Sequence, residues 1–253
     1  MPKINSKFKL FLLLLISGYV LYISLIFLCF YYFNTSQIKS QLTDLHFYFL
    51  ELNFFLIIVG FILIIPFFKN LIFTIPMRVV YLLIGITIIG TLLTSFIAPQ
   101  THRIFYDEDI YENIGQNLAT LQKAQLCNDG GTTYGVYSCH EGHYNKEPYA
   151  YPYLLSIVYR LFGVNETLSF IFNNLLLGIT IIIVFLLAFL LFKNYLIGIF
   201  AALVYTLIPQ NLLWFNTTAV EPSASLFSGI FIFAVVIFLK HKSTRSLFLL
   251  LLS

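Results

Sequence analysis

Residues 105–118 read FYDEDIYENIGQNL, and they place four acids within the six positions 107–112 of a chain in which acids are scarce. The stretch opens the one long polar segment of the sequence. Hydrophobic runs flank that segment on both sides, and each is about long enough to cross a bilayer. The chain therefore divides into helices suited to lipid and one segment suited to water, where we expect any chemistry to lie.

The composition indicates a membrane protein. The 253 residues are 59% hydrophobic and only 10% charged, whereas a soluble domain is about a quarter charged. Hydropathy predicts an all-α polytopic protein with spans at 10–33, 46–68, 77–98, 168–192, 195–213, 222–239 and an incomplete one from 246. We expect residues 1–76 to form an N-terminal pair of transmembrane helices and residues 77–253 a second transmembrane domain. Because the last run stops after a few residues, we expect the sequence to be a fragment.

Lysine and arginine residues predict the orientation of these spans, because cytoplasmic loops carry the excess of both. With the N-terminus inside, nine of the fourteen fall in cytoplasmic segments: Lys3, Lys7, Lys9, Lys69, Arg78, Lys193, Lys240, Lys242 and Arg245. The outer segment 99–166 then faces the extracytoplasmic side. The net charge of +3 is spread over loops and gives no case for nucleic acid as a partner.

Two amphipathic helices are predicted within the outer segment. Apolar residues recur at helical spacing after Asp107, through Ile114 and Leu118, and we expect this helix to lie along the membrane interface with Asp107 on its inward face. A second apolar face is formed by Leu154, Ile157, Val158, Leu161 and Phe162. Between the two helices, the glycines of residues 127–143 predict a loop.

Two sets of acids are candidates for chemistry. Asp107 and Glu108 suit the N-terminus of a helix, where acids cap the chain, and such capping is as good an interpretation as catalysis. A carboxylate on a wall of a membrane protein is nevertheless a functional candidate, because it could take a proton from an attacking hydroxyl or bind a metal or cationic group. Glu221 begins the sixth span just before Pro222, at the same predicted surface.

Four residues of the loop suggest other chemistry. His140 and His143 flank Glu141 and could ligate a metal, although exposed loop histidines are the commoner case and no clear third and fourth ligand is present. Cys127 and Cys139 bracket the glycine-rich loop. If that loop faces an oxidising compartment, we expect the two cysteines to form a structural disulfide.

Three blocks of the sequence resemble membrane glycosyltransferases of the GT-C fold, among them the protein O-mannosyltransferases and the aminoarabinose transferase of lipid A. Residues 107–118, with the pattern DExxYxxIGxxL, look like the family's first outer loop. Residues 146–155 (KEPYAYPYLL), followed by Leu161-Phe162-Gly163, resemble its next region, with Glu147 where the family commonly has proline. Residues 211–227, which contain Glu221, resemble its second outer loop.

The resemblance implies a GT-C-type helical bundle that takes a sugar from a polyprenyl-phosphate donor in the bilayer. The acceptor would be a protein or a lipid-linked glycan at the outer face, and 99–166 would be the catalytic loop. Asp107 would be the base, Glu108 and Glu221 would support it or contact the donor or a metal, and Tyr111 and Lys146 would bind substrate. A divalent metal could serve as cofactor, and the sequence leaves this requirement open. A non-catalytic membrane scaffold is the alternative, and a transporter is disfavoured because the spans carry almost no charge.

Overall fold

The computed structural model describes residues 6–102 and 105–241, and it is mostly helical, at 76%. Four helical stretches within these residues are long and apolar enough to cross a membrane: Thr35–Ile62, Met77–Phe96, Glu166–Phe192 and Glu221–Lys240. The expectation of an all-α membrane protein is confirmed at this level. The incomplete span from 246 lies outside the described residues.

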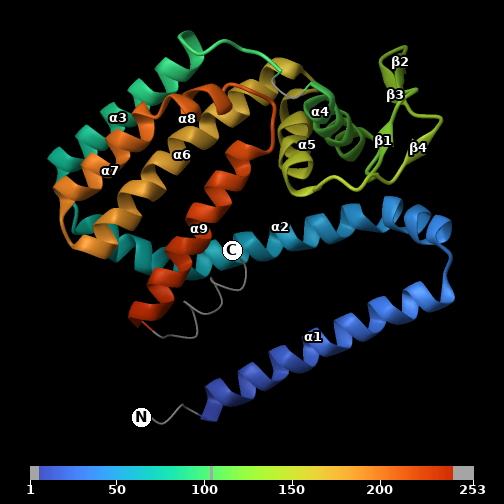
Figure 1. Ribbon diagram of the computed structural model, residues 1–253, viewed down its shortest axis with the longest axis horizontal. Helices are drawn as coiled ribbons and strands as arrows, with labels where there is room; N and C mark the ends of the chain where they lie inside the picture. Colours follow the sequence, from blue (N-terminus) through green and yellow to red (C-terminus); the bar gives the residue numbers. More distant parts are fainter. Residues whose placement is uncertain (1–5, 103–104, 242–253) are drawn as a thin grey trace.

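The elements follow one another in the order expected of hydrophobic helices interrupted by a polar segment (Figure 1). Their bounds are α1 Ser6–Tyr32, α2 Thr35–Phe73, α3 Met77–Phe96, α4 Phe105–Thr120, β1 Leu126–Cys127, β2 Gly131–Thr133, β3 Val136–Ser138, β4 Gly142–His143, α5 Ala150–Phe162, α6 Glu166–Phe192, α7 Tyr195–Leu207, α8 Pro209–Trp214 and α9 Glu221–His241. Asparagines begin three of these helices, because the side-chain oxygens of Asn34, Asn165 and Asn194 each accept a hydrogen bond from a first-turn backbone N–H.

The predicted span at 195–213 is wrong as a single helix. Ile208 has an extended backbone and separates α7 from α8, because the residue before a proline is disfavoured in a helix and Pro209 follows it. The 13 residues of α7 are about 20 Å long at 1.5 Å per residue, which is shorter than a bilayer core of about 30 Å.

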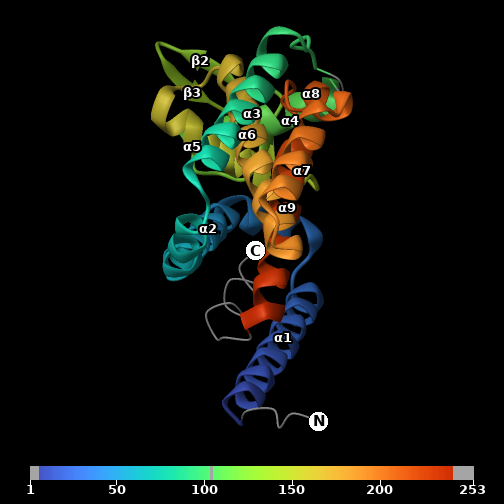
Figure 2. The same cartoon turned by 90° about the vertical axis from the view of Figure 1, so that its left-hand side faces the viewer.

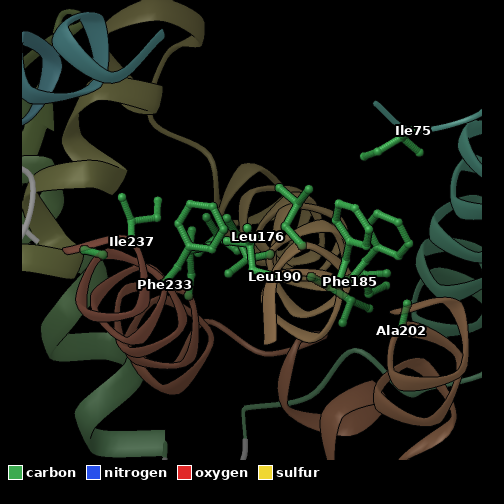
Figure 3. Packing of buried hydrophobic residues seen from close by; sticks show 14 of the residues in the cluster. Ile75, Leu176, Phe185, Leu190, Ala202, Phe233 and Ile237 are labelled. Carbon is green, nitrogen blue, oxygen red and sulfur yellow. The ribbon is translucent and has the colours of Figure 1, made fainter. Parts of the chain in front are cut away.

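The apolar core lies among α3, α6, α7 and α9, with α6 in the middle (Figure 3). Phe185 of α6 and Phe233 of α9 are fully buried in it. Small residues allow the helices to approach closely. At Gly198 of α7, an added Cβ would lie 2.9 Å from the Phe185 ring, so no larger side chain fits there without movement.

The polar segment lies at one end of this bundle. Two lysines, Lys193 and Lys240, lie at the other end. α3 ends, and α6 and α9 begin, at the end where α4 and α5 are packed (Figure 1). At the opposite end, the Tyr195 hydroxyl donates to the Thr74 carbonyl at 2.7 Å, and the Lys240 amine donates to the Leu190 carbonyl. Lys240 and Lys193 therefore lie far along the bundle from the acids of α4.

α2 is longer than the predicted span 46–68 and connects these two regions. Its first half packs against the polar segment, where the Thr43 carbonyl accepts from the Ala124 N–H at 2.8 Å and the Glu51 carboxylate pairs with Arg160 at 2.6 Å. In both views the hairpin of β2 and β3 projects at one extreme of the molecule and α1 lies at the other (Figures 1 and 2).

The apolar face of α4 is covered by protein. Ile114 and Leu118 are fully buried and pack with residues of α2, β1 and α5, including Phe47, Leu126 and Tyr153. Neighbouring elements thus supply the apolar surface that we expected lipid to supply, and the placement of α4 along the membrane interface stays a prediction.

The apolar face predicted for α5 is also not the buried one. Leu161 and Phe162 are 71% and 72% exposed, whereas Tyr151, Leu155 and Tyr159 are buried. Of the buried tyrosines, Tyr159 has a polar partner inside the protein, because its hydroxyl lies 2.8 Å from Ser169 Oγ. In a membrane protein, an outward apolar face costs little wherever it meets lipid.

The residues between α4 and α5 contain short strands as well as the predicted loop. β1 pairs with β4 and β2 pairs with β3, both antiparallel. Tyr134 and Gly135 have φ values of 52° and 79° and form the two-residue turn of the second hairpin, in the left-handed conformation that suits the twist of paired strands.

Candidate functional site

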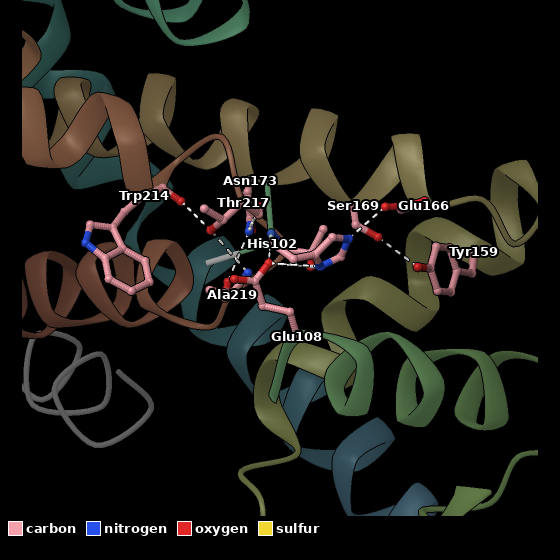
Figure 4. Close-up of polar contacts among 10 residues, drawn as sticks. His102, Glu108, Tyr159, Glu166, Ser169, Asn173, Trp214, Thr217 and Ala219 are labelled. Atoms are coloured by element: carbon pink, nitrogen blue, oxygen red, sulfur yellow. Dashed lines mark hydrogen bonds and ion pairs between the residues drawn. The ribbon is translucent and has the colours of Figure 1, made fainter. Parts of the chain in front are cut away.

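Glu108 connects α4 to the loop that precedes α9 (Figure 4). Its side chain is fully buried, and its Oε2 atom accepts from the Thr218 N–H at 3.1 Å and the Thr218 hydroxyl at 3.0 Å. A buried carboxylate is costly unless it is hydrogen-bonded. These bonds therefore favour one position of the loop relative to the start of α4.

Two amide side chains also fix this loop, one from α6 and one from the loop itself. Asn173 of α6 donates from Nδ2 to the Thr217 carbonyl at 2.7 Å and to the Ala219 carbonyl at 3.0 Å. Asn216 donates to the Ala98 carbonyl, just after α3, at 2.7 Å. The residues that lead into Glu221 are thus held by α3, α4 and α6 together.

Three carboxylates influence the pKa of the Tyr111 phenol. That pKa is raised to about 12, mainly by burial, and the charges of Glu147, Asp107 and Glu221 contribute to the rise in that order. The Oε2 atom of Glu221 is buried and has no hydrogen-bond partner among the described residues. Acids from α4, from the connection before α5 and from α9 therefore act on one hydroxyl group, although they lie up to 114 positions apart in the sequence.

A second polar cluster lies beside the first and centres on His102. Its Nε2 atom lies 2.7 Å from a Glu166 oxygen, and its Nδ1 atom lies 3.2 Å from Glu108 Oε2 and 3.3 Å from Thr218 Oγ1. Burial lowers the pKa of His102, but the Glu166 hydrogen bond and the charges of Glu108, Glu112 and Glu166 outweigh that effect and leave the pKa raised.

Glu112 belongs to this second cluster. Burial raises its pKa to about 7, against a smaller opposing effect of a hydrogen bond from Ser169 and the charge of His102. Its Oε1 atom is buried without a hydrogen-bond partner among the residues described. A carboxyl group with this pKa exchanges its proton near neutral pH.

The structure separates the roles of the two acids that open α4. The sequence predicted that Asp107 points inward, but Asp107 is partly exposed and Glu108 is the buried one. Because Glu108 has no accessible surface in this conformation, its position favours the expected role of support for Asp107 over contact with a donor or a metal. Tyr111 is buried with its ring packed edge-on against Tyr151, at 6.0 Å between centroids, and Lys146 is exposed.

Cys127 and Cys139 form a disulfide, with their Cα atoms 6.0 Å apart. His140 and His143 are both exposed. Within the described ranges, one group of three side chains has the spacing of metal ligands, namely Cys127, Asp129 and Cys139. It includes neither histidine, and its two sulfur atoms are bonded to each other, so the loop offers no metal centre of the kind the sequence suggested.

Three residues of the two clusters were not singled out by the sequence. Glu112 follows Glu108 at the helical spacing of four, which could have placed both on one face. Glu147 stands where the resembled family commonly has proline, which could have marked it as distinctive. No local pattern marks His102, because Glu166 and Thr218 are 64 and 116 positions away.

Comparison with known proteins adds no further constraint, since no family model, curated protein or solved structure matches the chain.

Proposed function

We propose that this chain belongs to an integral membrane glycosyltransferase that moves a sugar from a polyprenyl-phosphate donor to a protein or lipid-glycan acceptor. The observation that carries the proposal is the pair of hydrogen bonds between Glu108 and Thr218, which joins the start of α4, with Asp107, to the loop that leads into Glu221. The resemblance of residues 107–118 and 211–227 to the two outer loops of GT-C enzymes gives Asp107 and Glu221 their interpretation.

The chemistry assigns Asp107 as the residue that activates the acceptor. Glycosyl transfer needs a group that removes or orients the proton of the attacking hydroxyl, and a carboxylate within hydrogen-bond reach can do so. Asp107 is partly exposed and can meet an acceptor, whereas Glu108 is enclosed. Glu221, with a buried oxygen that has no partner among the described residues, is the second carboxylate of the site.

The location suits a donor that is anchored in lipid. The acids lie where α3 ends and where α6 and α9 begin, so they lie at one end of the membrane-crossing bundle. A polyprenyl-phosphate sugar presents its head group at the bilayer surface, and a site at a bundle end can reach it without leaving the membrane. The excess of Lys and Arg in the other loops favours an orientation with this end outside the cytoplasm.

Asp107→Asn tests the proposal. Asp107 is the third residue of α4, so asparagine keeps the size of the side chain and loses the charge, at a helix-dipole cost of only about 0.3–1 kcal/mol. Transfer of labelled sugar from polyprenyl-phosphate donors in membranes should fall by about 10²–10⁴-fold, at an unchanged protein level. Asp109→Asn, an exposed residue of the same turn, is the matched control and should transfer at the wild-type rate.

Wild-type transfer by Asp107→Asn would remove Asp107 from the chemistry. Absence of transfer by the wild-type protein with every polyprenyl-phosphate sugar tried would instead reject the transferase and leave the membrane scaffold as the function.

A further inference from the structure

We infer that His102 is a positioning residue that holds the starts of α4 and α9 together and ties both to α6. The role in catalysis rests on the proposed function, since these helix starts carry Asp107 and Glu221. The positioning role itself rests only on the contacts of His102.

The first step is the short chain of contacts between the two acids. Asp107 directly precedes Glu108, and Thr218 lies three residues before Glu221. The Glu108–Thr218 hydrogen bonds therefore set the separation of Asp107 and Glu221 through very few rotatable bonds. Anything that stabilises this contact fixes the geometry of the site.

The second step is that His102 touches both partners of that contact and one further element. Its Nδ1 atom faces Glu108 and Thr218, and its Nε2 atom faces Glu166, the first residue of α6. The ring also packs edge-on against Phe170 of α6, at 5.8 Å between centroids. His102 is thus a bridge from the Glu108–Thr218 contact to α6.

The bridge depends on the charge of the His102 ring. Both ring nitrogens face carboxylate oxygens, and an imidazole can donate from both only when it carries two protons, because the neutral ring has a single N–H. The ionisable groups that face it are Glu108 and Glu112 from α4 and Glu166 from α6, while α5 contributes Tyr159 behind Ser169. All three carboxylates favour the charged ring, so the bridge is complete at low pH and weakens as pH rises.

The pH dependence of the bridge follows from the pKa of His102. The pKa of His102 is raised above its ordinary value, so the bridge is fully formed below about pH 6.5 and is lost as pH rises through the raised pKa. Alkaline solution should therefore loosen α9 against α4.

Spin-label distances measure this coupling without any assay of activity. Labels on cysteines at Asp109 and Ala224, both exposed, report on α4 and α9 in a Cys29→Ser background with the disulfide intact. In bilayer nanodiscs at pH 6, the wild-type distance distribution should be narrow, and at pH 9 it should broaden. His102→Gln should be broad at both pH values, and His140→Gln, at an exposed histidine of the same segment, should match wild type.

A His102→Gln distribution as narrow as wild type at pH 6, or a wild-type distribution that does not change up to pH 9, would overturn the inference. The second measurement needs no substitution at His102, so it decides the matter even if the variant fails to fold. For the transferase, His102→Gln should lower kcat more than it changes KM and should remove the alkaline fall of the pH profile. Altered distances in a protein that transfers no sugar would uphold the positioning role and reject only the proposed function.

Discussion

Replacing Glu112 by glutamine should make the protein more stable in mildly alkaline solution. The folded state raises the pKa of Glu112 from an ordinary value of 4.5 to about 7, mainly by burial. Each pKa unit corresponds to about 1.4 kcal/mol, so ionised Glu112 would cost about 3 kcal/mol of folding free energy. Because the side chain is only half-buried, solvent screening reduces the expected cost to about 1–2 kcal/mol.

The direction follows from the raised pKa. The stability that neutral Glu112 allows is fully present below about pH 4.5 and is lost as pH rises through about 7. Glu112→Gln has no proton to lose, so it should match wild type near pH 5 and exceed it at pH 8. A difference of 1–2 kcal/mol corresponds to roughly 2–8 °C in Tm for a chain of this size.

Thermal unfolding in detergent micelles at pH 5, 6.5 and 8 provides the measurement. Asp109→Asn, an exposed acid on the same helix, controls for removal of a charge without removal of burial. The reasoning is refuted if Glu112→Gln and wild type show the same change in Tm between pH 5 and pH 8, or if the variant is the less stable protein at pH 8.

Two further predictions concern the bundle and its orientation. Gly198→Leu should destabilise the protein strongly, because even a Cβ at this position would lie 2.9 Å from the Phe185 ring. Gly85→Leu is the control and should unfold at the wild-type temperature, because nothing lies within 4 Å of a Cβ there. The fraction of protein that stays folded in detergent on heating measures both effects. Single cysteines can be introduced at Gln122 and Lys242 in a background without other cysteines. An impermeant thiol reagent applied to intact cells should label the cysteine at 122 only. Labelling at 242 alone would reverse the predicted orientation of the spans.

The sequence predicted the features that depend on neighbouring residues. Apolar runs set the main helices, and spacing after Asp107 set α4. The break before Pro209 could have been predicted too, since a residue that precedes proline disfavours helix, but continuous hydropathy concealed it. Burial within the polar segment was not predictable, because the partners of Glu108 and Tyr151 come from distant elements. Which of Asp107 and Glu108 is buried depends on how α4 is rotated about its axis, and packing against the other elements decides that rotation.

The length of α2 couples the thickness of the membrane to the position of the polar segment. Contacts to that segment run from Thr43 to Phe54, whose ring packs against Tyr153, and 19 residues then remain before α2 ends at Phe73. At 1.5 Å per residue these span about 28 Å, close to the thickness of a bilayer core. A helix in a thinner or thicker bilayer changes its tilt, and this part of α2 can also bend at Pro66, because an interior proline removes a helical hydrogen bond. The Glu51–Arg160 pair lies on the other half of α2, so we expect changes in lipid composition to reach the α5 side of the site through this helix.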